Sequence, residues 1–308
     1  MRRSWSWTVA LPHLALISVF VLWGYNNVPM KIGGIEWNPV LFNAFRYAGI
    51  APVVWAYTYW YYRRHRLEWS FDSRDWLPIA GYALLSSAGM EVVLSYALPY
   101  STAANAAILG RGMIPVWVGI VALSLREMSP SARTMAGIPL AFGGTLLIVA
   151  GNPIGIGPDT WRGDVLLLLR SVFGAVYMIG MRGLLRKYPV PLLLAIEISI
   201  SGAVLLPFGL LTAPSGALAA VTADGWFSLA YASIVALFIG FLLHNWGLSR
   251  LGPFKASVYG YLMPLSAALA GYVTFGEQLR WYQLAGGAAV LIAMYLIQSD
   301  RMKEAKPG

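Results

Sequence analysis

The sequence of 308 residues contains no cysteine, only three histidines and few charged residues, which make up 11% of the chain. The absence of cysteine excludes disulfide bonds and thiolate metal sites, and three histidines offer little to a metal ion. Acidic residues are the scarcest charged type, with 13 Asp and Glu against 22 Lys and Arg. We therefore expect no metal centre and no cofactor. The net charge of +9 raises the question of an anionic partner, such as a nucleic acid or a membrane.

Hydrophobic residues fill the chain in runs that are long enough to cross a bilayer. They make up 58% of the sequence, which includes 13 Trp and 17 Tyr. A hydrocarbon core of about 30 Å needs roughly 20 apolar residues in an α-helix. Such spans are expected at residues 9–30, 38–60, 77–98, 102–124, 131–151, 162–183, 189–212, 226–247, 253–274 and 281–299. The sequence thus predicts an all-α, multi-pass integral membrane protein of the cytoplasmic (plasma or inner) membrane with ten transmembrane helices.

Basic residues are distributed unequally between the two sides of these spans. If the N-terminus is cytoplasmic, 16 Lys and Arg lie in cytoplasmic segments, and only Lys31, Arg162 and Arg280 lie on the opposite side. Cytoplasmic loops of membrane proteins carry such an excess. Both termini are therefore predicted to be cytoplasmic, and contact with anionic membrane lipids explains the positive charge without a nucleic acid. The first span is expected to be a helix and not a signal peptide, because it is long and contains Asn26 and Asn27.

The second half of the sequence repeats landmarks of the first half about 150 residues later. In each half a proline lies within one span, a glutamate follows that span and a glycine lies in the next: Pro115, Glu127 and Gly137, then Pro264, Glu277 and Gly286. The offsets are 149, 150 and 149 residues. We predict two repeats of five helices each, residues 10–151 and 162–299. Because five is odd, the second repeat enters the membrane from the opposite side, so the repeats are predicted to be inverted, as in many transporters.

These landmarks resemble the EamA-type branch of the drug/metabolite transporter superfamily, over residues 10–298. The matching residues are Trp23-Gly24-Tyr25-Asn26-Asn27, Lys31, Arg46, Pro115, Glu127, Phe275-Gly276-Glu277 and Gly286. The resemblance implies a ten-helix carrier with a central cavity, often an exporter of amino acids or related metabolites. Some relatives in this superfamily instead import sugars, choline or phosphorylated compounds. The sequence has Arg126 before Glu127 where the family usually has glycine, so the resemblance does not extend to one subfamily.

Five ionisable side chains fall inside the expected spans: Arg46, Glu91, Arg111, Arg170 and Glu197. Charged residues are costly in the bilayer core and by default indicate a functional site. Arg46, Glu91 and Arg111 lie at similar depth from the predicted outer face, so they could form an ion pair or triad. That group would be either a structural lock between helices or part of a substrate site. Three Arg against two Glu favour an anionic or zwitterionic substrate over a cation.

Aromatic and amide side chains extend this candidate substrate site. We predict that Trp23, Asn27, Tyr177 and Tyr259 line a cavity together with Arg46, Glu91, Arg111 and Arg170, because aromatic rings beside polar groups suit an organic solute. Packing between helices, or a place in an interfacial aromatic belt, is the alternative for each of them.

In the third span, Ser87 and Ser95 flank Glu91 at i−4 and i+4. In an α-helix this spacing places the three side chains on one face. We therefore predict a polar stripe that faces protein or water and not lipid.

Glu197 and His244 are the predicted candidates for proton coupling. A shift of 151 residues places Glu197 at the position equivalent to Arg46, so corresponding positions carry opposite charges. Buried carboxyl groups and histidines can exchange protons near neutral pH. The alternative role for His244 is a cap at the cytoplasmic end of its helix.

The sequence thus predicts a secondary transporter of a small organic metabolite, most simply an amino-acid or related-metabolite exporter that works by alternating access. An importer of another small solute, such as a sugar, choline or a phosphorylated metabolite, is the alternative within this class. A non-transporting membrane subunit is the competing class, and the oligomeric state is left open. An intramembrane enzyme is disfavoured, because the sequence has no cysteine and no H-x-x-x-H or paired-Asp motif.

Overall fold

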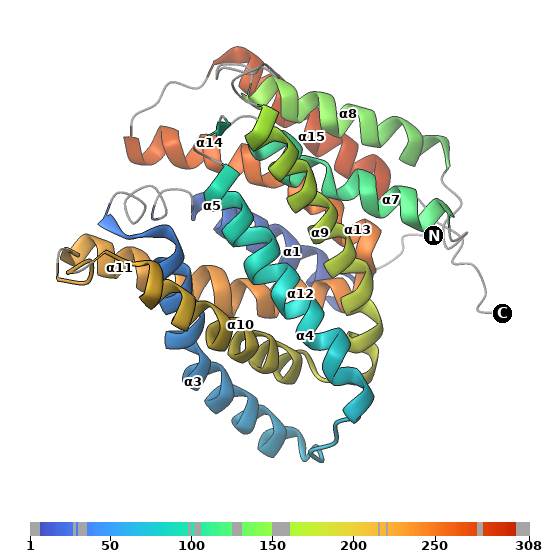
Figure 1. The fold of residues 1–308 in the computed structure, drawn as a ribbon. Coiled ribbons are helices and arrows are strands. Elements are labelled where there is room, and N and C mark those ends of the chain that lie inside the picture. The colour runs from blue at the N-terminus through green and yellow to red at the C-terminus, as the bar shows by residue number, and fades with distance from the viewer. Residues whose placement is uncertain are drawn as a thin grey trace.

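A computed structural model of the chain is helical throughout its described part, and no strand occurs there (Figure 1). The structure describes residues 7–26, 29, 36–97, 100–101, 106–124, 131–149, 161–214, 216–219, 221–275 and 280–299. The predicted all-α class is therefore correct for these residues.

The first half of the chain forms helical stretches over its expected spans. They are α1 (Trp7–Tyr25), α3 (Pro39–His65), the run of α4 (Trp76–Leu84), η2 (Leu85–Val92) and α5 (Val93–Ala97), the run of η4 (Ala106–Gly112) and α7 (Ile114–Ser124), and α8 (Ala132–Val149). A short 3₁₀ turn, η1 (Ser73–Asp75), precedes α4. Asn38 caps the start of α3, where its side chain accepts hydrogen bonds from the backbone N–H groups of Val40 and Leu41.

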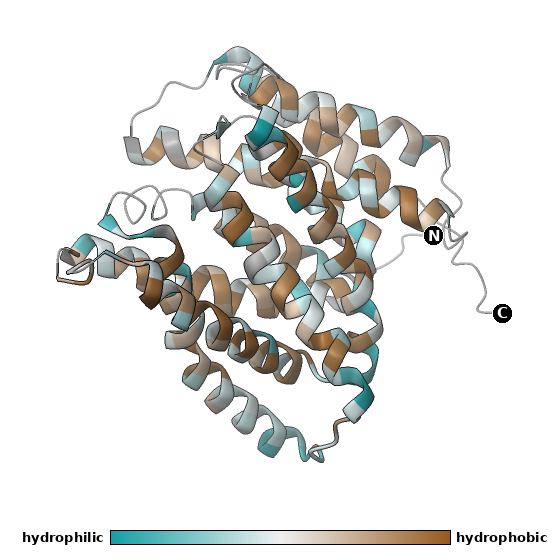
Figure 2. Cartoon of the chain, viewed as in Figure 1, coloured by the Kyte–Doolittle hydropathy of each residue, from teal (hydrophilic) through white to brown (hydrophobic). Residues whose placement is uncertain are grey.

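The second half follows the same order. It comprises α9 (Trp161–Lys187), α10 (Val190–Thr212), the run of α11 (Ala223–Tyr231), η5 (Ala232–Ile239) and α12 (Gly240–Leu251), the run of α13 (Pro253–Val258), η6 (Tyr259–Tyr261) and α14 (Leu262–Phe275), and α15 (Trp281–Ser299). Four helical stretches among the described residues are long and apolar enough to cross a membrane: Trp161–Lys187, Val190–Thr212, Ala223–Leu251 and Trp281–Ser299. Figure 2 shows hydrophobic colour along the helices and hydrophilic colour at the C-terminal ends of α3 and α9.

Several of the helices are interrupted by turns that are not α-helical. Segments η2, η4 and η5 are π-helical, and η6 is a 3₁₀ turn. The repeated prolines lie directly after two of these interruptions, Pro115 in the first turn of α7 and Pro264 in the first turn of α14. A π-helical turn frees backbone carbonyl groups from the regular ladder, and such turns are frequent at functional sites.

The two halves pack on each other through equivalent helices. The most extensive contacts join α3 to α10 and α8 to α15, which are the second and the fifth helical stretch of each half. Helix α1 packs on α12 and α14, and α9 correspondingly packs on η2, α5, η4 and α7. Each first helix therefore lies against the third and fourth stretches of the other half.

Individual contacts at the crossing of α8 and α15 are also repeated with their partners exchanged. A Cβ on Gly286 would lie 2.5 Å from the carbonyl oxygen of Gly144, and one on Gly137 would lie 3.2 Å from that of Ala293. The offset of 149 residues relates Gly137 to Gly286 and also Gly144 to Ala293. The α8–α15 crossing therefore contains one contact twice, with the partners exchanged between the halves.

The α3–α10 pair contains a second contact of this kind. Thr58 Oγ1 donates to the carbonyl oxygen of Pro191 at 3.0 Å, and a Cβ on Gly209 would lie 3.4 Å from the carbonyl oxygen of Val40. An offset of 151 residues relates Thr58 to Gly209 and Val40 to Pro191.

Two polar clamps also join the halves. In the first clamp, the Tyr188 hydroxyl donates to Asp75 Oδ2 at 2.7 Å, and Lys187 Nζ lies 3.2 Å from both carboxylate oxygens of Asp75. In the second clamp, Trp37 Nε1 donates to the carbonyl oxygen of Gly225 at 3.1 Å. Trp37 and Tyr188 are 151 residues apart, and Asp75 and Gly225 are 150 apart. The clamps thus occupy corresponding places in the two halves.

Candidate functional site

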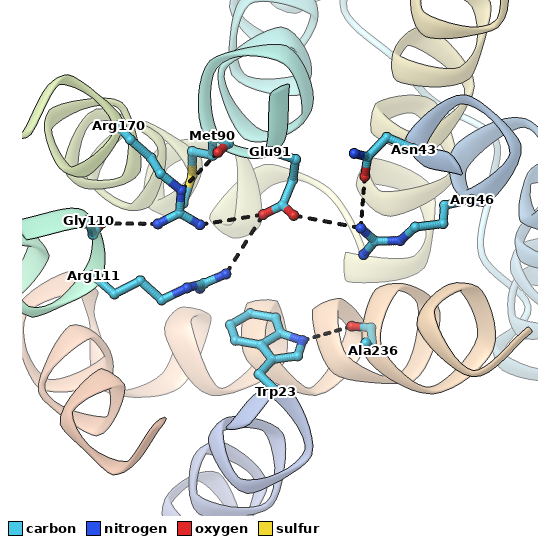
Figure 3. Close-up of polar contacts among 9 residues, drawn as sticks. All are labelled: Trp23, Asn43, Arg46, Met90, Glu91, Gly110, Arg111, Arg170 and Ala236. Carbon is cyan, nitrogen blue, oxygen red and sulfur yellow. Dashed lines mark hydrogen bonds and ion pairs between the residues drawn. The ribbon is translucent and has the colours of Figure 1, made fainter. Parts of the chain in front are cut away.

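The carboxylate of Glu91 is the centre of an ion cluster that draws on four helical stretches. Its oxygens lie 3.6 Å from Arg46 Nη1, 3.7 Å from Arg111 Nη2 and 3.6 Å from Arg170 Nη2 (Figure 3). Glu91 belongs to η2, while the arginines belong to α3, η4 and α9. The sequence left open whether Glu91 meets Arg46 and Arg111, and the structure contains both contacts. It adds Arg170, which comes from the second half of the chain.

The two π-helical segments shape this cluster. Arg170 Nε donates to the carbonyl oxygen of Met90 in η2 at 2.8 Å, and its Nη1 donates to that of Gly110 in η4 at 3.0 Å. One guanidinium thus satisfies carbonyl groups of both interrupted helices and pairs with Glu91. Because the residues that follow these carbonyls are Glu91 and Arg111, Arg170 fixes the positions from which both side chains extend.

The four charged side chains differ in exposure. The side chains of Arg46 and Arg170 are 5% and 1% exposed, whereas those of Glu91 and Arg111 are 16% and 25% exposed. Arg46 has a second partner, because its Nη1 also donates to Asn43 Oδ1 at 2.8 Å. Arg46 and Arg170 therefore support the cluster, and Glu91 and Arg111 form its accessible side.

Trp23 connects the ion cluster to a group of aromatic side chains. Its Nε1 donates to the carbonyl oxygen of Ala236 in η5 at 2.7 Å, and Arg111 Cζ lies 5.6 Å from the centre of the indole ring (Figure 3). The ring centres of Phe20, Phe241 and His244 lie 5.2–5.3 Å from that of Trp23. The rings of Phe20 and His244 lie 5.9 Å apart. An apolar wall therefore lies beside the charged groups, which is the composition of many small-molecule sites.

Glu197 lies in a separate hydrogen-bond network. Ser86 Oγ donates to Glu197 Oε1 at 2.5 Å, and the Tyr177 hydroxyl donates to Oε2 at 3.1 Å. The Asn245 side-chain amide lies 3.4 Å from the Tyr177 hydroxyl, and its Oδ1 lies 3.2 Å from His244 Nδ1. A continuous chain of hydrogen bonds thus joins the two residues predicted to exchange protons. All five side chains are buried.

The remaining predicted site residues lie elsewhere or are not described. The Tyr259 hydroxyl forms a hydrogen bond with His13 Nδ1 and thereby links η6 to α1. Asn27 lies outside the described residues. In the predicted polar stripe of the third span, Ser87 is buried and its Oγ donates to the carbonyl oxygen of Ala83, one turn earlier. The Ser95 side chain is not described.

Sequence reasoning missed two kinds of site group. Ser86 and Asn245 contact the Glu197 network directly, and the only sequence signal for them is a polar residue next to a predicted stripe or next to His244. The carbonyl groups of Met90 and Gly110 carry no side-chain signal at all. Tyr47, which follows Arg46, is fully buried, and its hydroxyl has no hydrogen-bond partner among the described residues.

Fold and site together define a polytopic integral membrane protein with a buried ion cluster between its helices. The EamA-like transporter family matches residues 10–150 and 161–299, and the chain therefore belongs to the EamA-like transporter family. Family and relatives indicate a transporter and not an enzyme.

Relatives of known sequence match nearly the whole chain. An uncharacterized transporter of Archaeoglobus fulgidus is 28% identical over 287 residues, covering 92% of this chain and 96% of the relative. A protein of Salmonella typhimurium named "probable amino-acid metabolite efflux pump" is 24% identical and covers 92% of this chain and 93% of its own length. YedA of Escherichia coli, an uncharacterized inner membrane transporter, is 24% identical, with coverage of 95% and 92%. The relatives are transporters, and one is assigned to the inner membrane.

A solved crystal structure has the same fold. It superimposes with a TM-score of 0.79 at 18% sequence identity, covering 94% of this chain and 98% of the other chain. At this identity the likeness concerns the fold alone.

Proposed function

We propose that this protein is a secondary carrier that moves a small organic metabolite, related to amino acids, out of the cell by alternating access. One observation carries the proposal. The first helix of each half, α1 or α9, packs on the third and fourth helical stretches of the other half, and the Glu91 cluster lies where α9 meets η2 and η4. Two copies that pack about a two-fold axis can rock against each other around a central site. The Salmonella typhimurium relative, named "probable amino-acid metabolite efflux pump", supports the direction and the substrate type.

The membrane arrangement follows from the same reasoning. We propose that the ten expected spans all cross the membrane, as two inverted repeats at residues 10–151 and 162–299. The contacts Gly137–Ala293 and Gly286–Gly144, which the offset of 149 residues converts into each other, support a two-fold relation between the halves. The excess of Lys and Arg on one side supports cytoplasmic termini.

The substrate site is proposed to lie on the accessible side of the ion cluster. It comprises Glu91, Arg111 and Trp23, with Arg46 and Arg170 behind them. Tyr177 borders it from the Glu197 network, and Asn27 is proposed to complete the wall. Tyr259 is left out of the proposed site, because its hydroxyl forms a hydrogen bond with His13. Partial exposure of Glu91 and Arg111, beside an aromatic wall, supports this choice.

Glu197 is proposed to carry the coupling proton, with His244 as its relay. No cation lies within 4 Å of its carboxylate among the described residues, and its two partners are hydroxyl groups. Protonation of Glu197 would therefore break no ion pair among the described residues. Hydrogen bonds through Tyr177 and Asn245 connect Glu197 to His244 and orient the two groups toward each other.

Flux through proteoliposomes tests the proposal. Purified protein is reconstituted, and uptake of pooled labelled amino acids, aromatic acids, sugars, choline and phosphorylated metabolites is measured with and without a pH gradient. We expect uptake of one solute class that a pH gradient accelerates. Absence of flux for every solute, with the protein shown to be folded and inserted, would favour a non-transporting subunit.

A further inference from the structure

The ion cluster around Glu91 contains more positive than negative charge. Three arginines share the single carboxylate of Glu91, which leaves two formal positive charges in excess among these four residues. Arg46 and Arg170 are almost fully buried, so water screens this excess poorly. Uncompensated charge of this kind is costly inside a membrane protein and is usually offset by a partner.

The hydrogen bonding of the cluster is also incomplete. All three Glu91–arginine distances are 3.6 or 3.7 Å, whereas a charge-assisted N–H···O hydrogen bond is about 2.7–2.9 Å long. Arg46 Nε and Arg170 Nη2 are buried and have no hydrogen-bond partner among the described residues. The guanidinium groups therefore surround the Glu91 carboxylate without being saturated by it. Two buried guanidinium nitrogens, Arg46 Nε and Arg170 Nη2, therefore remain to donate to a further acceptor.

The side chains around the cluster indicate what kind of ligand would carry that acceptor group. Arg111 is the most exposed of the four charged side chains, and the Trp23 ring lies 5.6 Å from its guanidinium carbon. Phe20 and Phe241 continue the wall at 5.3 Å from Trp23. Apolar rings beside unsaturated guanidinium groups suit a ligand with an aromatic body and a planar anionic end.

We propose that the cluster binds the carboxylate of an aromatic carboxylic acid, with Arg111 as its first contact and Trp23 against its ring. This inference rests on the proposed carrier function and names the substrate class of the same site. Glu91 keeps the arginines in place when no substrate is bound, and the substrate carboxylate competes with it. Three guanidinium groups already surround Glu91, so a substrate ammonium finds no free acidic partner there.

A matched series of ligands isolates the role of charge. 3-Phenylpropionate, L-phenylalanine and phenethylamine share an aromatic body and differ in carrying an anionic, a zwitterionic or a cationic end. Binding of each, and of inorganic phosphate, is measured by isothermal titration calorimetry on the purified full chain. We expect 3-phenylpropionate to bind at least about tenfold more tightly than the other three. Equal or tighter binding of phenethylamine, L-phenylalanine or phosphate, or no binding of any probe to folded protein, overturns the assignment.

Two substitutions test the residues. Arg111→Gln is expected to weaken 3-phenylpropionate binding about tenfold or more, while the matched control Arg162→Gln, an exposed arginine beside Trp161, leaves it unchanged. Glu91→Gln is expected to tighten binding of the acid, because it removes the competing carboxylate. Unchanged binding by Arg111→Gln overturns the proposal, as does loss of acid binding in a folded Glu91→Gln protein.

Flux measurements separate this inference from the proposed function. Transport of a neutral or cationic solute that is unaffected by Arg111→Gln would leave the carrier function standing and overturn the carboxylate site. Arg111-dependent binding of 3-phenylpropionate without flux of any solute would support the site and contradict the carrier function.

Discussion

Arg46 and Glu197 occupy corresponding positions in the two halves of the chain, 151 residues apart, and carry opposite charges in different networks. Arg46 pairs with Glu91 at 3.6 Å, whereas Glu197 accepts hydrogen bonds from Ser86 and Tyr177. The helices that hold them, α3 and α10, pack directly on each other. A scaffold whose contacts repeat between the halves thus holds chemistry that does not repeat. This asymmetry allows one network to bind an anion while the other exchanges protons.

Arg170 is expected to be essential for the folded structure. Its guanidinium satisfies the carbonyl groups of Met90 and Gly110 and pairs with Glu91, and its side chain is 1% exposed. Glu91 would keep Arg46 and Arg111, but each carbonyl group left buried without its donor costs about 1–3 kcal/mol. Arg170→Met should therefore lower the unfolding temperature in detergent by several degrees, measured by differential scanning fluorimetry. Arg162→Gln, at an exposed position of the same helix, is the control, and an equal shift for both variants would contradict the role given to Arg170.

Glu197→Gln is expected to uncouple transport from the pH gradient. A glutamine cannot exchange a proton but retains a similar shape. Its side-chain oxygen can accept one of the two hydrogen bonds from Ser86 and Tyr177, and its Nε2 can donate to the other hydroxyl oxygen. We expect flux driven by the gradient to fall about tenfold or more, while exchange of labelled for unlabelled solute continues. The measurement is uptake into proteoliposomes with and without the gradient. Gradient-driven uptake at the wild-type rate would remove Glu197 from the coupling step.

Tyr177→Phe provides a milder test of the same network. It removes the hydroxyl that links Glu197 to Asn245 and leaves the ring in place. We expect the pH dependence of flux to shift without loss of solute binding. If binding and pH dependence both stay unchanged, the chain of hydrogen bonds to His244 has no part in coupling.

The clamp at Asp75 is expected to make stability depend on pH. The hydrogen bond from Tyr188, followed by that from Lys187 and its charge, lowers the pKa of the Asp75 carboxyl below its ordinary value. The clamp therefore stabilises the fold fully above the ordinary aspartate pKa of about 3.9, and loses this contribution as the pH falls through the lowered value. Asp75→Asn should lower the unfolding temperature at pH 7 and have a smaller effect at pH 3. Glu68→Gln in the exposed loop is the control, and a pH-independent difference for Asp75→Asn would count against the clamp.

Adjacent glycines in α8 give a matched test of the helix crossing. A Cβ on Gly144 would lie 2.7 Å from the carbonyl oxygen of Gly286, whereas one on Gly143 would meet nothing within 4 Å. Gly144→Ala should separate α8 from α15 and lower the unfolding temperature. Gly143→Ala should leave it unchanged or raise it slightly, because alanine favours helix by about 1 kcal/mol over glycine. Similar unfolding temperatures for the two variants would show that the crossing is not closely packed.

Much of this architecture could be predicted from hydrophobic pattern and from internal repetition. Apolar runs are a strong signal because backbone groups in lipid must be satisfied within a helix, and the offset of 149 residues between Gly137 and Gly286 marks a real packing position. The partnership of Glu91 with Arg46 and Arg111 was also within reach, since an isolated charge in a span requires a partner.

The details of the site could not be predicted, because they depend on departures from the α-helix. The hydrophobic pattern does not reveal that Leu85–Val92 is π-helical, or that Ser86 of this segment reaches Glu197. Arg170 reaches Glu91 from the other half of the chain and binds backbone carbonyl groups, which have no signature in sequence.

Counterflow is the measurement that tests the central claim most directly. Proteoliposomes are preloaded with the unlabelled solute that is transported best, and uptake of the labelled solute is followed without a pH gradient. A carrier with one site that faces the two sides alternately predicts faster and transiently concentrative uptake into preloaded vesicles, and loss of this effect in Arg111→Gln but not in Arg162→Gln. Uptake that is the same with and without preloading would contradict alternating access around the Glu91 cluster.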